Sequence, residues 1–345
     1  MLTPEAVRNG FLAFAHHTVH DSPLYSRLSP QIAADEDLVR LCQCGRMPIS
    51  NLFLAAVQAE LAKSDHPLRE WYPQLEGGPT SDDDPWPAFR AFVLEHREAI
   101  RGHLTTRRVQ TNEVGRTVYL LPTFARLAAG RPVALVEFGA SMGLNLCLDH
   151  FRVETEAGSF GDPNARLTLR TSWSPRESTP TDGPPHVVSR VGVDLHPLDV
   201  ASEADRDWLR ALLWPEQAER RPILDLAMQI AQELRPRVWQ GDAVEETAKH
   251  ALLAPADAVP IVFQTHVFYQ LAPEQIERFH ALMLAASRER PMWFVSRHDD
   301  LRVTRYEQGR AREFVIASPH HHGRWVREWL WPPELDAATK LERLA

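Results

Sequence analysis

The pattern of apolar and polar residues changes near residue 130. Before that position, apolar residues recur every three or four residues in the segments 7–14, 52–61 and 89–104, which is the period of an amphipathic helix. After it, short apolar runs alternate with helical stretches. We therefore predict a helical N-terminal region over 1–130, acting as a lid or substrate-binding part, and an α/β domain over 131–345.

Five apolar runs in the second region predict strands, at 133–138, 191–194, 238–240, 260–264 and 291–296. Helical patterns separate them, at 144–149, 205–213 with 224–234, 244–253 and 273–287. This alternation predicts a Rossmann-like, mostly parallel sheet with crossover helices. The segments 314–317 and 324–330 predict an antiparallel hairpin at its edge. The stretch 151–190, rich in Gly, Pro, Thr and Ser, predicts an inserted hairpin.

The first predicted strand runs into a glycine turn, in the sequence VALVEFGASMGLNL. The apolar run ends in Glu137, and Gly139, Ser141 and Gly143 follow before Asn145. Glycine lets backbone N–H groups approach a ligand without a Cβ in the way. A helix beginning there would add unpaired donors and partial positive charge. The segment 133–145 is therefore predicted to bind a small cofactor.

Three kinds of site have a turn of this type. A dinucleotide site requires GxGxxG, which fails here at Ser141 and Leu144. GASMG satisfies the GxSxG of a serine hydrolase with Ser141 as the nucleophile, although that turn normally follows several strands and here follows the first. The acidic residue and spaced glycines of an S-adenosylmethionine site match Glu137, Gly139 and Gly143, with Ser141 in place of one glycine. The hydrolase remains the alternative enzyme.

Polar residues also follow the later predicted strands. Asp194 ends the second, Gly241-Asp242-Ala243 follows the third, and Gln264-Thr265-His266 follows the fourth. Ligands of open parallel sheets bind beyond the carboxyl ends of the strands, where an acidic residue accepts from ribose hydroxyls. The predicted cofactor-binding residues are Glu137, Gly139, Ser141, Gly143, Asn145, Asp194, Leu195, Gly241, Asp242, Ala243 and Thr265.

A second polar cluster precedes the sheet, in the sequence RRVQTNEVGR at 107–116. Thr111 or Asn112 could cap the following helix, since such side chains compete for backbone groups. As a polar lid, the cluster predicts substrate contacts from Gln110, Thr111, Asn112, Glu113 and Arg116, with Arg116 able to pair with a carboxylate. The predicted catalytic residues are His266, as a general base, and Tyr269. The three histidines 320–322 predict a solvated turn rather than a metal site.

The composition of the chain limits the kinds of partner that we expect. The 345-residue chain carries a formal charge of −8 and has no dense run of Lys or Arg, so a nucleic-acid partner is not expected. Three cysteines are too few for a secreted disulfide framework. No apolar run has the length of a membrane span, and the start of the chain has no signal-peptide pattern. We expect a cytoplasmic protein that acts on a small molecule, without a membrane partner or a metal.

Three motifs together resemble a known family. QTNEVGR, VEFGASMGLNL and RVGVDLHPLDV followed by DWLRALLWPEQAERR are similar to a bacterial family, domain of unknown function 2332, over nearly the whole chain. The resemblance implies no established activity. Its sheet region looks like the class I methyltransferase fold, with Ser141 and the 151–190 insertion as departures. The predicted function is S-adenosylmethionine-dependent methyl transfer to a small molecule. A serine hydrolase and a non-catalytic Rossmann-like ligand-binding protein are the alternatives.

Overall fold

The computed structural model describes residues 1–76, 83–176, 180 and 183–335. The chain forms two compact units. The first comprises Met1–Thr111 and Ser202–Leu224, and the second comprises Asn112–Ala201 and Asp225–Ala345. The boundary predicted between residues 130 and 131 differs from the boundaries of these two units. The second unit already starts at Asn112, and the first unit receives a later segment of the chain.

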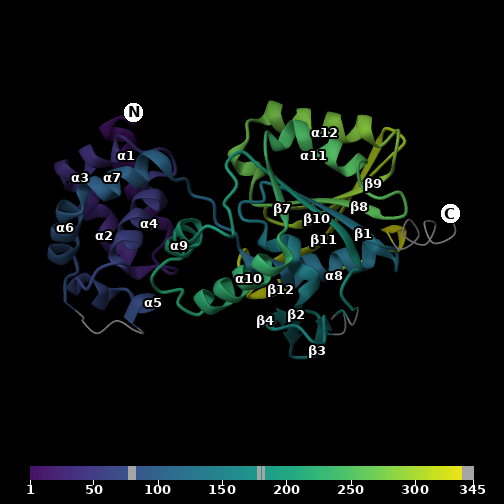
Figure 1. The fold of residues 1–345 in the computed structure, drawn as a ribbon, viewed down its shortest axis with the longest axis horizontal. Helices are drawn as coiled ribbons and strands as arrows, with labels where there is room; N and C mark the ends of the chain where they lie inside the picture. The colour runs from purple at the N-terminus through teal and green to yellow at the C-terminus, as the bar shows by residue number, and fades with distance from the viewer. Residues whose placement is uncertain (77–82, 177–179, 181–182, 336–345) are drawn as a thin grey trace. The chain divides into compact units, whose positions relative to one another are not determined.

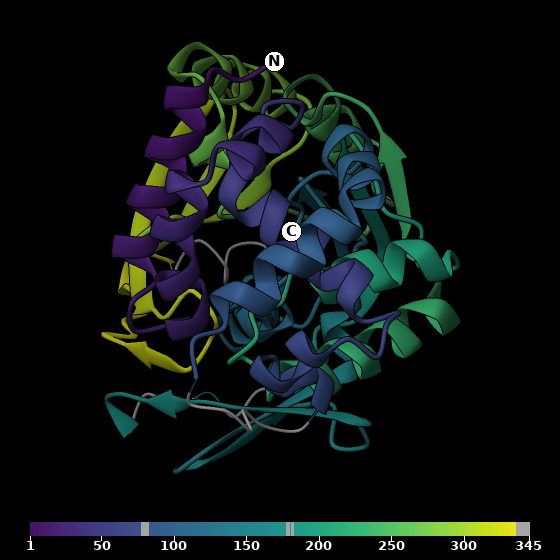
Figure 2. The same ribbon diagram turned by 90° about the vertical axis from the view of Figure 1, so that its left-hand side faces the viewer.

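The first unit is helical, and Figure 2 looks onto its helices. Its elements are α1 (Pro4–His17), α2 (Pro23–Ala34), α3 (Glu36–Cys42), α4 (Ile49–Leu61), η1 (Pro67–Trp71), α5 (Pro73–Glu76), α6 (Trp86–Glu95), α7 (Arg97–Thr106) and α9 (Glu203–Ala211). Helix α4 is buried on nearly all sides, and its Phe53 meets the ring of Phe11 edge-on with centroids 5.8 Å apart. As predicted, the described residues before Val133 contain no strand.

Helix α9 belongs to this first unit, which corrects its predicted place as a crossover helix of the sheet. Its buried face carries Trp208, whose indole N–H donates to the carbonyl oxygen of Arg108 at 2.8 Å. Gln58 on α4 donates to the carbonyl oxygen of Leu213 at 2.8 Å. The chain therefore leaves the sheet unit after Ala201, completes the helical unit, and returns through α10 (Arg220–Leu234).

The second unit contains a central nine-stranded sheet of order β5-β12-β11-β10-β9-β8-β1-β6-β7. Its strands are β1 (Val133–Phe138), β5 (Ser172–Trp173), β6 (Val187–Asp194), β7 (Arg237–Gln240), β8 (Val259–Thr265), β9 (Met292–Arg297), β10 (Leu301–Glu307), β11 (Arg310–Pro319) and β12 (Trp325–Arg327). The run β7-β6-β1-β8-β9 is parallel and contains all five predicted strands. The predicted tail hairpin is the antiparallel pair β11–β12, whereas β10, which lies between β9 and β11, was not predicted.

Helices cover both faces of this sheet (Figure 1). On one face, α11 (Ala243–Leu252) and α12 (Pro273–Ala286) pack on an apolar cluster that includes Val136 and Phe138. On the other face lies α8 (Thr117–Ala128), where Phe124 meets Phe263 of β8 at 5.1 Å between ring centroids. Successive side chains of a strand point to opposite faces. Glu137, between Val136 and Phe138, therefore points to the α8 face.

The insertion after β1 forms a separate three-stranded sheet of order β3-β2-β4. Its strands are β2 (Phe151–Thr155), β3 (Gly158–Gly161) and β4 (Leu167–Arg170). The predicted hairpin is the antiparallel pair β2–β3, and β4 runs parallel to β2. The predicted helix at 144–149 is a 3-10 helix, η3 (Leu144–His150), and two further short ones are η2 (Val114–Arg116) and η5 (Phe268–Gln270). In the part of the chain that the structure describes, every helix is too short or too polar to cross a membrane.

Candidate functional site

Buried polar side chains gather on the α8 face of the sheet, at the carboxyl ends of its parallel strands. Glu137 is on this face, and so are Asp194, Thr265 and Arg297. Each of these three lies one or three positions after a residue of its strand that faces the apolar α11 side, and side chains of a strand alternate between the two faces. Thr265 of β8 lies directly opposite Arg297 of β9 in the strand register. Four side chains thus reach one edge of the sheet from four different strands, those of Glu137, Asp194, Thr265 and Arg297.

The turn after β1 is made of left-handed residues at alternate positions. The φ angles are 72° at Gly139, 54° at Ser141 and 76° at Gly143. A Cβ at Gly139 would lie 2.8 Å from Val267 Cγ2, so this position also needs glycine for space. Serine in this conformation costs about 1–2 kcal/mol. Such strain persists where the surrounding structure over-determines it, and it concentrates at functional sites.

Asp194 holds this turn closed. Its Oδ2 accepts from the backbone N–H of Ser141 at 2.8 Å, and its Oδ1 accepts from the N–H of His196 at 2.8 Å. These two contacts fix the backbone of Ser141 and of His196, so Asp194 shapes the turn.

Glu137 and Asn145 form a buried pair beneath the turn. The Nδ2 of Asn145 donates to Glu137 Oε1 at 3.3 Å. Glu137 Oε2 and Asn145 Oδ1 are buried and have no hydrogen-bond partner among the described residues. Burial raises the pKa of Glu137 to about 8, and the charge of Asp194 adds to this shift, while Asn145 and Arg116 act against it. Once Glu137 releases its proton, Oε2 and Asn145 Oδ1 are two buried acceptors without a partner, and such acceptors are costly unless a ligand supplies donors.

The segment 112–116 packs onto the turn and onto the loop after β11. Asn112 Oδ1 accepts from the N–H of Leu144 at 2.9 Å. Glu113 accepts from the N–H of Gly115 at 2.9 Å, and its second oxygen lies 2.5 Å from Nδ1 of His322. Asn112 and Glu113, which were predicted to bind substrate, therefore lie at the turn after β1 and at the loop after β11, where their side chains also hold the backbone in place.

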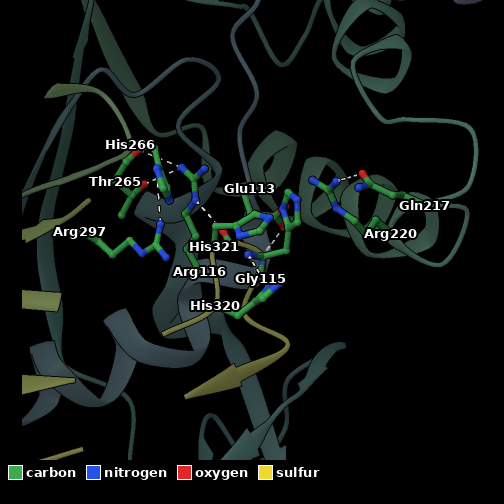
Figure 3. A network of polar contacts seen from close by, with 11 residues as sticks. Glu113, Gly115, Arg116, Gln217, Arg220, Thr265, His266, Arg297, His320 and His321 are labelled. Carbon is green, nitrogen blue, oxygen red and sulfur yellow. Dashed lines mark hydrogen bonds and ion pairs between the residues drawn. The ribbon is translucent and has the colours of Figure 1, made fainter. Parts of the chain in front are cut away.

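Arg116 and Arg297 are both buried at this edge (Figure 3). Nη1 of Arg116 donates to the backbone oxygen and to Oγ1 of Thr265, at 2.9 and 2.8 Å. Nη2 of Arg297 donates to the carbonyl oxygen of Pro319 at 2.7 Å. Among the described residues, no carboxylate lies within ion-pair distance of either guanidinium. The edge is therefore electropositive.

His266 lies between the two arginines and has a left-handed backbone, with φ 58°. Burial lowers its pKa to about 2, and the charges of Arg116 and Arg297 add to the effect. Burial also lowers the pKa of His321 to about 3, with the neighbouring histidines and the same two arginines contributing. Both imidazoles are neutral. This low pKa disfavours the predicted role of His266 as a general base, because protonated His266 would be a third cation beside Arg116 and Arg297.

The other predicted residues lie nearer the surface. Asp242 caps α11 by accepting from the N–H of Val244 at 2.9 Å, between the half-buried Gly241 and the buried Ala243. Leu195 and Tyr269 are 59% and 63% exposed. The remaining two, Gln110 and Thr111, belong to the first unit.

Two residues of this site were not predicted, Arg297 and His321. The predicted fifth strand stopped at 296, one residue short of Arg297, which is the last residue of β9. The histidines 320–322 are half-buried against η2 rather than a solvated turn, and the carbonyl oxygen of His321 accepts from Arg116 Nε at 3.4 Å. Across the described residues, no group of three or more His, Cys, Asp and Glu side chains is placed to hold a metal ion.

Comparisons with known proteins complete the description. Neither a search of curated proteins nor a search of solved structures returns a match. A family model does match, over residues 8–329. The chain therefore belongs to the family described as "Uncharacterized protein conserved in bacteria (DUF2332)".

Proposed function

We propose that this protein is an S-adenosylmethionine-dependent methyltransferase that acts on a small molecule, with a class I methyltransferase-like sheet unit. The observation that carries the proposal is the pair of partnerless buried acceptors, Glu137 Oε2 and Asn145 Oδ1, beneath the left-handed turn that follows β1. They match a donor-rich, cationic group such as the ammonium of a methionine moiety. The turn and Asp194 match the nucleoside part.

The topology of the sheet supports this proposal. Counted along the chain, the parallel strands have the spatial order 3-2-1-4-5, which begins the strand order of doubly wound nucleotide-binding sheets. Ligands of such sheets bind where the order reverses, beyond the carboxyl ends of the strands. Here the reversal falls between β1 and β8, and the turn at Gly139–Gly143 follows β1 directly.

The chain's residues have separate tasks in the proposed reaction. When bound, S-adenosylmethionine supplies an electrophilic methyl group. Glu137 and Asn145 would accept from its ammonium, and Asp194 would accept from its ribose hydroxyls. Asp242, at the start of α11, would hold the adenine. Methyl transfer depends mainly on in-line positioning. We give His266 no proton-accepting step, because burial, together with the charges of Arg116 and Arg297, lowers its pKa to about 2.

Calorimetry with S-adenosylmethionine and S-adenosylhomocysteine tests the cofactor. Both are expected to bind with one site per chain. Asp194→Ala removes a carboxylate that accepts two backbone N–H groups and is proposed to accept from ribose, so the affinity should fall roughly 30-fold, or about 2 kcal/mol. Asp162→Ala is the matched control, because Asp162 Oδ1 accepts from the N–H of Asn164 at 2.9 Å in the loop between β3 and β4. Absence of binding, or equal affinity of Asp194→Ala and wild type, would contradict the proposal.

The second candidate, a serine hydrolase, is favoured by the left-handed backbone of Ser141 in GASMG. Against it, Ser141 is only 4% exposed, whereas the nucleophile of a GxSxG turn points outward. Ser141→Gly separates the two functions. Because glycine adopts this conformation without strain, the variant should retain or strengthen S-adenosylhomocysteine binding and gain about 1 kcal/mol of stability. Labelling of the wild type by a fluorophosphonate probe, lost in Ser141→Gly, would establish the hydrolase instead.

The third possibility is a ligand-binding protein without catalysis. Binding of S-adenosylhomocysteine would leave it open, since both functions use the same site. Native mass spectrometry of the purified protein, which reveals the mass of any ligand that co-purifies, addresses it directly. A co-purified ligand unrelated to S-adenosylmethionine would favour the binding protein.

A further inference from the structure

The two buried arginines are held by backbone oxygens and by Oγ1 of Thr265, and neither forms an ion pair with a carboxylate among the described residues. Arg116 donates to carbonyl oxygens of Thr265 and His321, and Arg297 donates to that of Pro319. These carbonyl groups orient the guanidiniums without neutralising them. Burying a charge without an opposite charge is costly. Such an arrangement is retained where a ligand brings the missing charge.

Donors without a partner point to the same conclusion. Nε of Arg297 and Nε2 of His266 are buried and have no hydrogen-bond partner among the described residues. Nη1 of Arg297 lies 3.5 Å from Nδ1 of His266, and because a guanidinium only donates, this contact makes Nδ1 the acceptor. The neutral imidazole then carries its proton on Nε2. Arg297 and His266 thus each present an unused N–H at the edge of the sheet.

We propose that Arg116, Arg297 and the Nε2–H of His266 bind an anionic oxygen group, a carboxylate or a phosphate, of the small molecule that accepts the methyl group. The fork of an arginine matches either anion with two parallel hydrogen bonds. The statement that the anion belongs to the methyl acceptor rests on the proposed function. The anion site itself rests only on the contacts of Arg116, Arg297 and His266.

The sheet order assigns the anion to the acceptor rather than to the cofactor. Of the proposed nucleoside contacts, Asp194 ends β6 and Asp242 follows β7, and both strands lie on one side of β1 in the sheet. Arg297 ends β9, on the opposite side and two strands away from β1. Adjacent strands are about 4.8 Å apart, so Arg297 lies roughly 10 Å along the sheet from β1. A cofactor that extends from β1 toward β7 leaves the β8–β9 edge to the second reactant.

The wild-type chain provides the first test. Inorganic phosphate and malonate are titrated by calorimetry at constant ionic strength, with chloride as the compensating anion. We expect one site per chain for at least one of the two probes, and the probe that binds more tightly identifies the anion class. Absence of binding for both at millimolar concentration would overturn the proposal without any variant.

Substitutions locate the site. Arg297→Gln should weaken probe binding at least tenfold, because it removes the positive charge and the unused Nε–H of Arg297. Arg297→Lys, which keeps the charge and loses the fork, should fall between that variant and wild type. Arg302→Gln is the matched control, since Arg302 is a partly exposed arginine on the neighbouring β10. Its probe affinity should stay within twofold of wild type. Equal effects of Arg297→Gln and Arg302→Gln would overturn the site.

Saturation with S-adenosylhomocysteine separates this inference from the proposed function. A probe that binds equally well to the saturated protein occupies the acceptor's place, as proposed. A probe displaced by S-adenosylhomocysteine would show that the guanidiniums hold the cofactor's carboxylate, which overturns the assignment to the acceptor. Binding of S-adenosylhomocysteine without phosphate or malonate would refute the anion site and keep the proposed function. The reverse result would refute the proposed function and keep the anion site.

Discussion

Glu137→Gln is expected to make the stability of this protein far less dependent on pH. Glu137 has an ordinary pKa of 4.5 when unfolded and a pKa of about 8 in the folded chain, because burial disfavours its charged form. The folded state therefore holds a proton that the unfolded state has lost between these two pH values. The contribution of Glu137 to the free energy of unfolding is therefore greatest below pH 4.5, and it is lost as the pH rises to 8.

The size of the effect follows from the two pKa values. Each pH unit between them costs the wild type about 1.4 kcal/mol, so the whole interval amounts to about 5 kcal/mol. Glutamine keeps the acceptor that Asn145 uses and never ionises. The variant should match wild type at pH 4.5 and be more stable by about 3 kcal/mol at pH 7.

Urea unfolding of both proteins at several pH values between 4.5 and 8.5 measures this difference. Glu289→Gln, at an exposed position after α12, is the control and should show no such trend. A difference between Glu137→Gln and wild type that stays constant over this range would mean that Glu137 is charged in the folded protein. The proposed pairing of Glu137 with a cationic group would then need no proton release.

The second large effect concerns the contact between the segment 113–116 and the loop 320–323. Gly323 has a φ of 71°, and a Cβ there would lie 2.0 Å from the carbonyl oxygen of Gly115. Gly323→Ala adds backbone strain of about 1–2 kcal/mol to an overlap that the two backbone segments can relieve only by separating, worth about 1–3 kcal/mol. We expect a loss of about 4 kcal/mol of unfolding free energy.

Gly130→Ala is a closely matched control for this prediction. Gly130 has a φ of 84°, but a Cβ there meets nothing within 4 Å. It should therefore cost only the backbone strain, about 1–2 kcal/mol. Equal losses in the two variants would show that the loop 320–323 yields easily. The loop would then be a poor support for His321 and for the contact of His322 with Glu113.

Much of the sheet was predictable from the residues alone. Buried parallel strands are continuous apolar runs, and the five runs from 133–138 to 291–296 are strands of the parallel part. The residues with special backbone needs were also visible, since Gly139 and Gly143 mark left-handed positions after β1. The antiparallel β10, LRVTRYE, was missed because polar residues interrupt any apolar run, although Thr304 and Arg305 are buried in the structure.

Local sequence by itself determined the strands, the glycine turn and the polar residues at the strand ends, because backbone propensity and burial act over a few residues. Only the tertiary structure decided which of these residues meet. Arg116 and Arg297 lie 181 positions apart in the chain and become neighbours of His266 through strand pairing and the packing of η2. Non-local packing also placed α9 in the helical unit. An amphipathic pattern predicts that one face of a helix is buried, but it does not identify the element that covers this face.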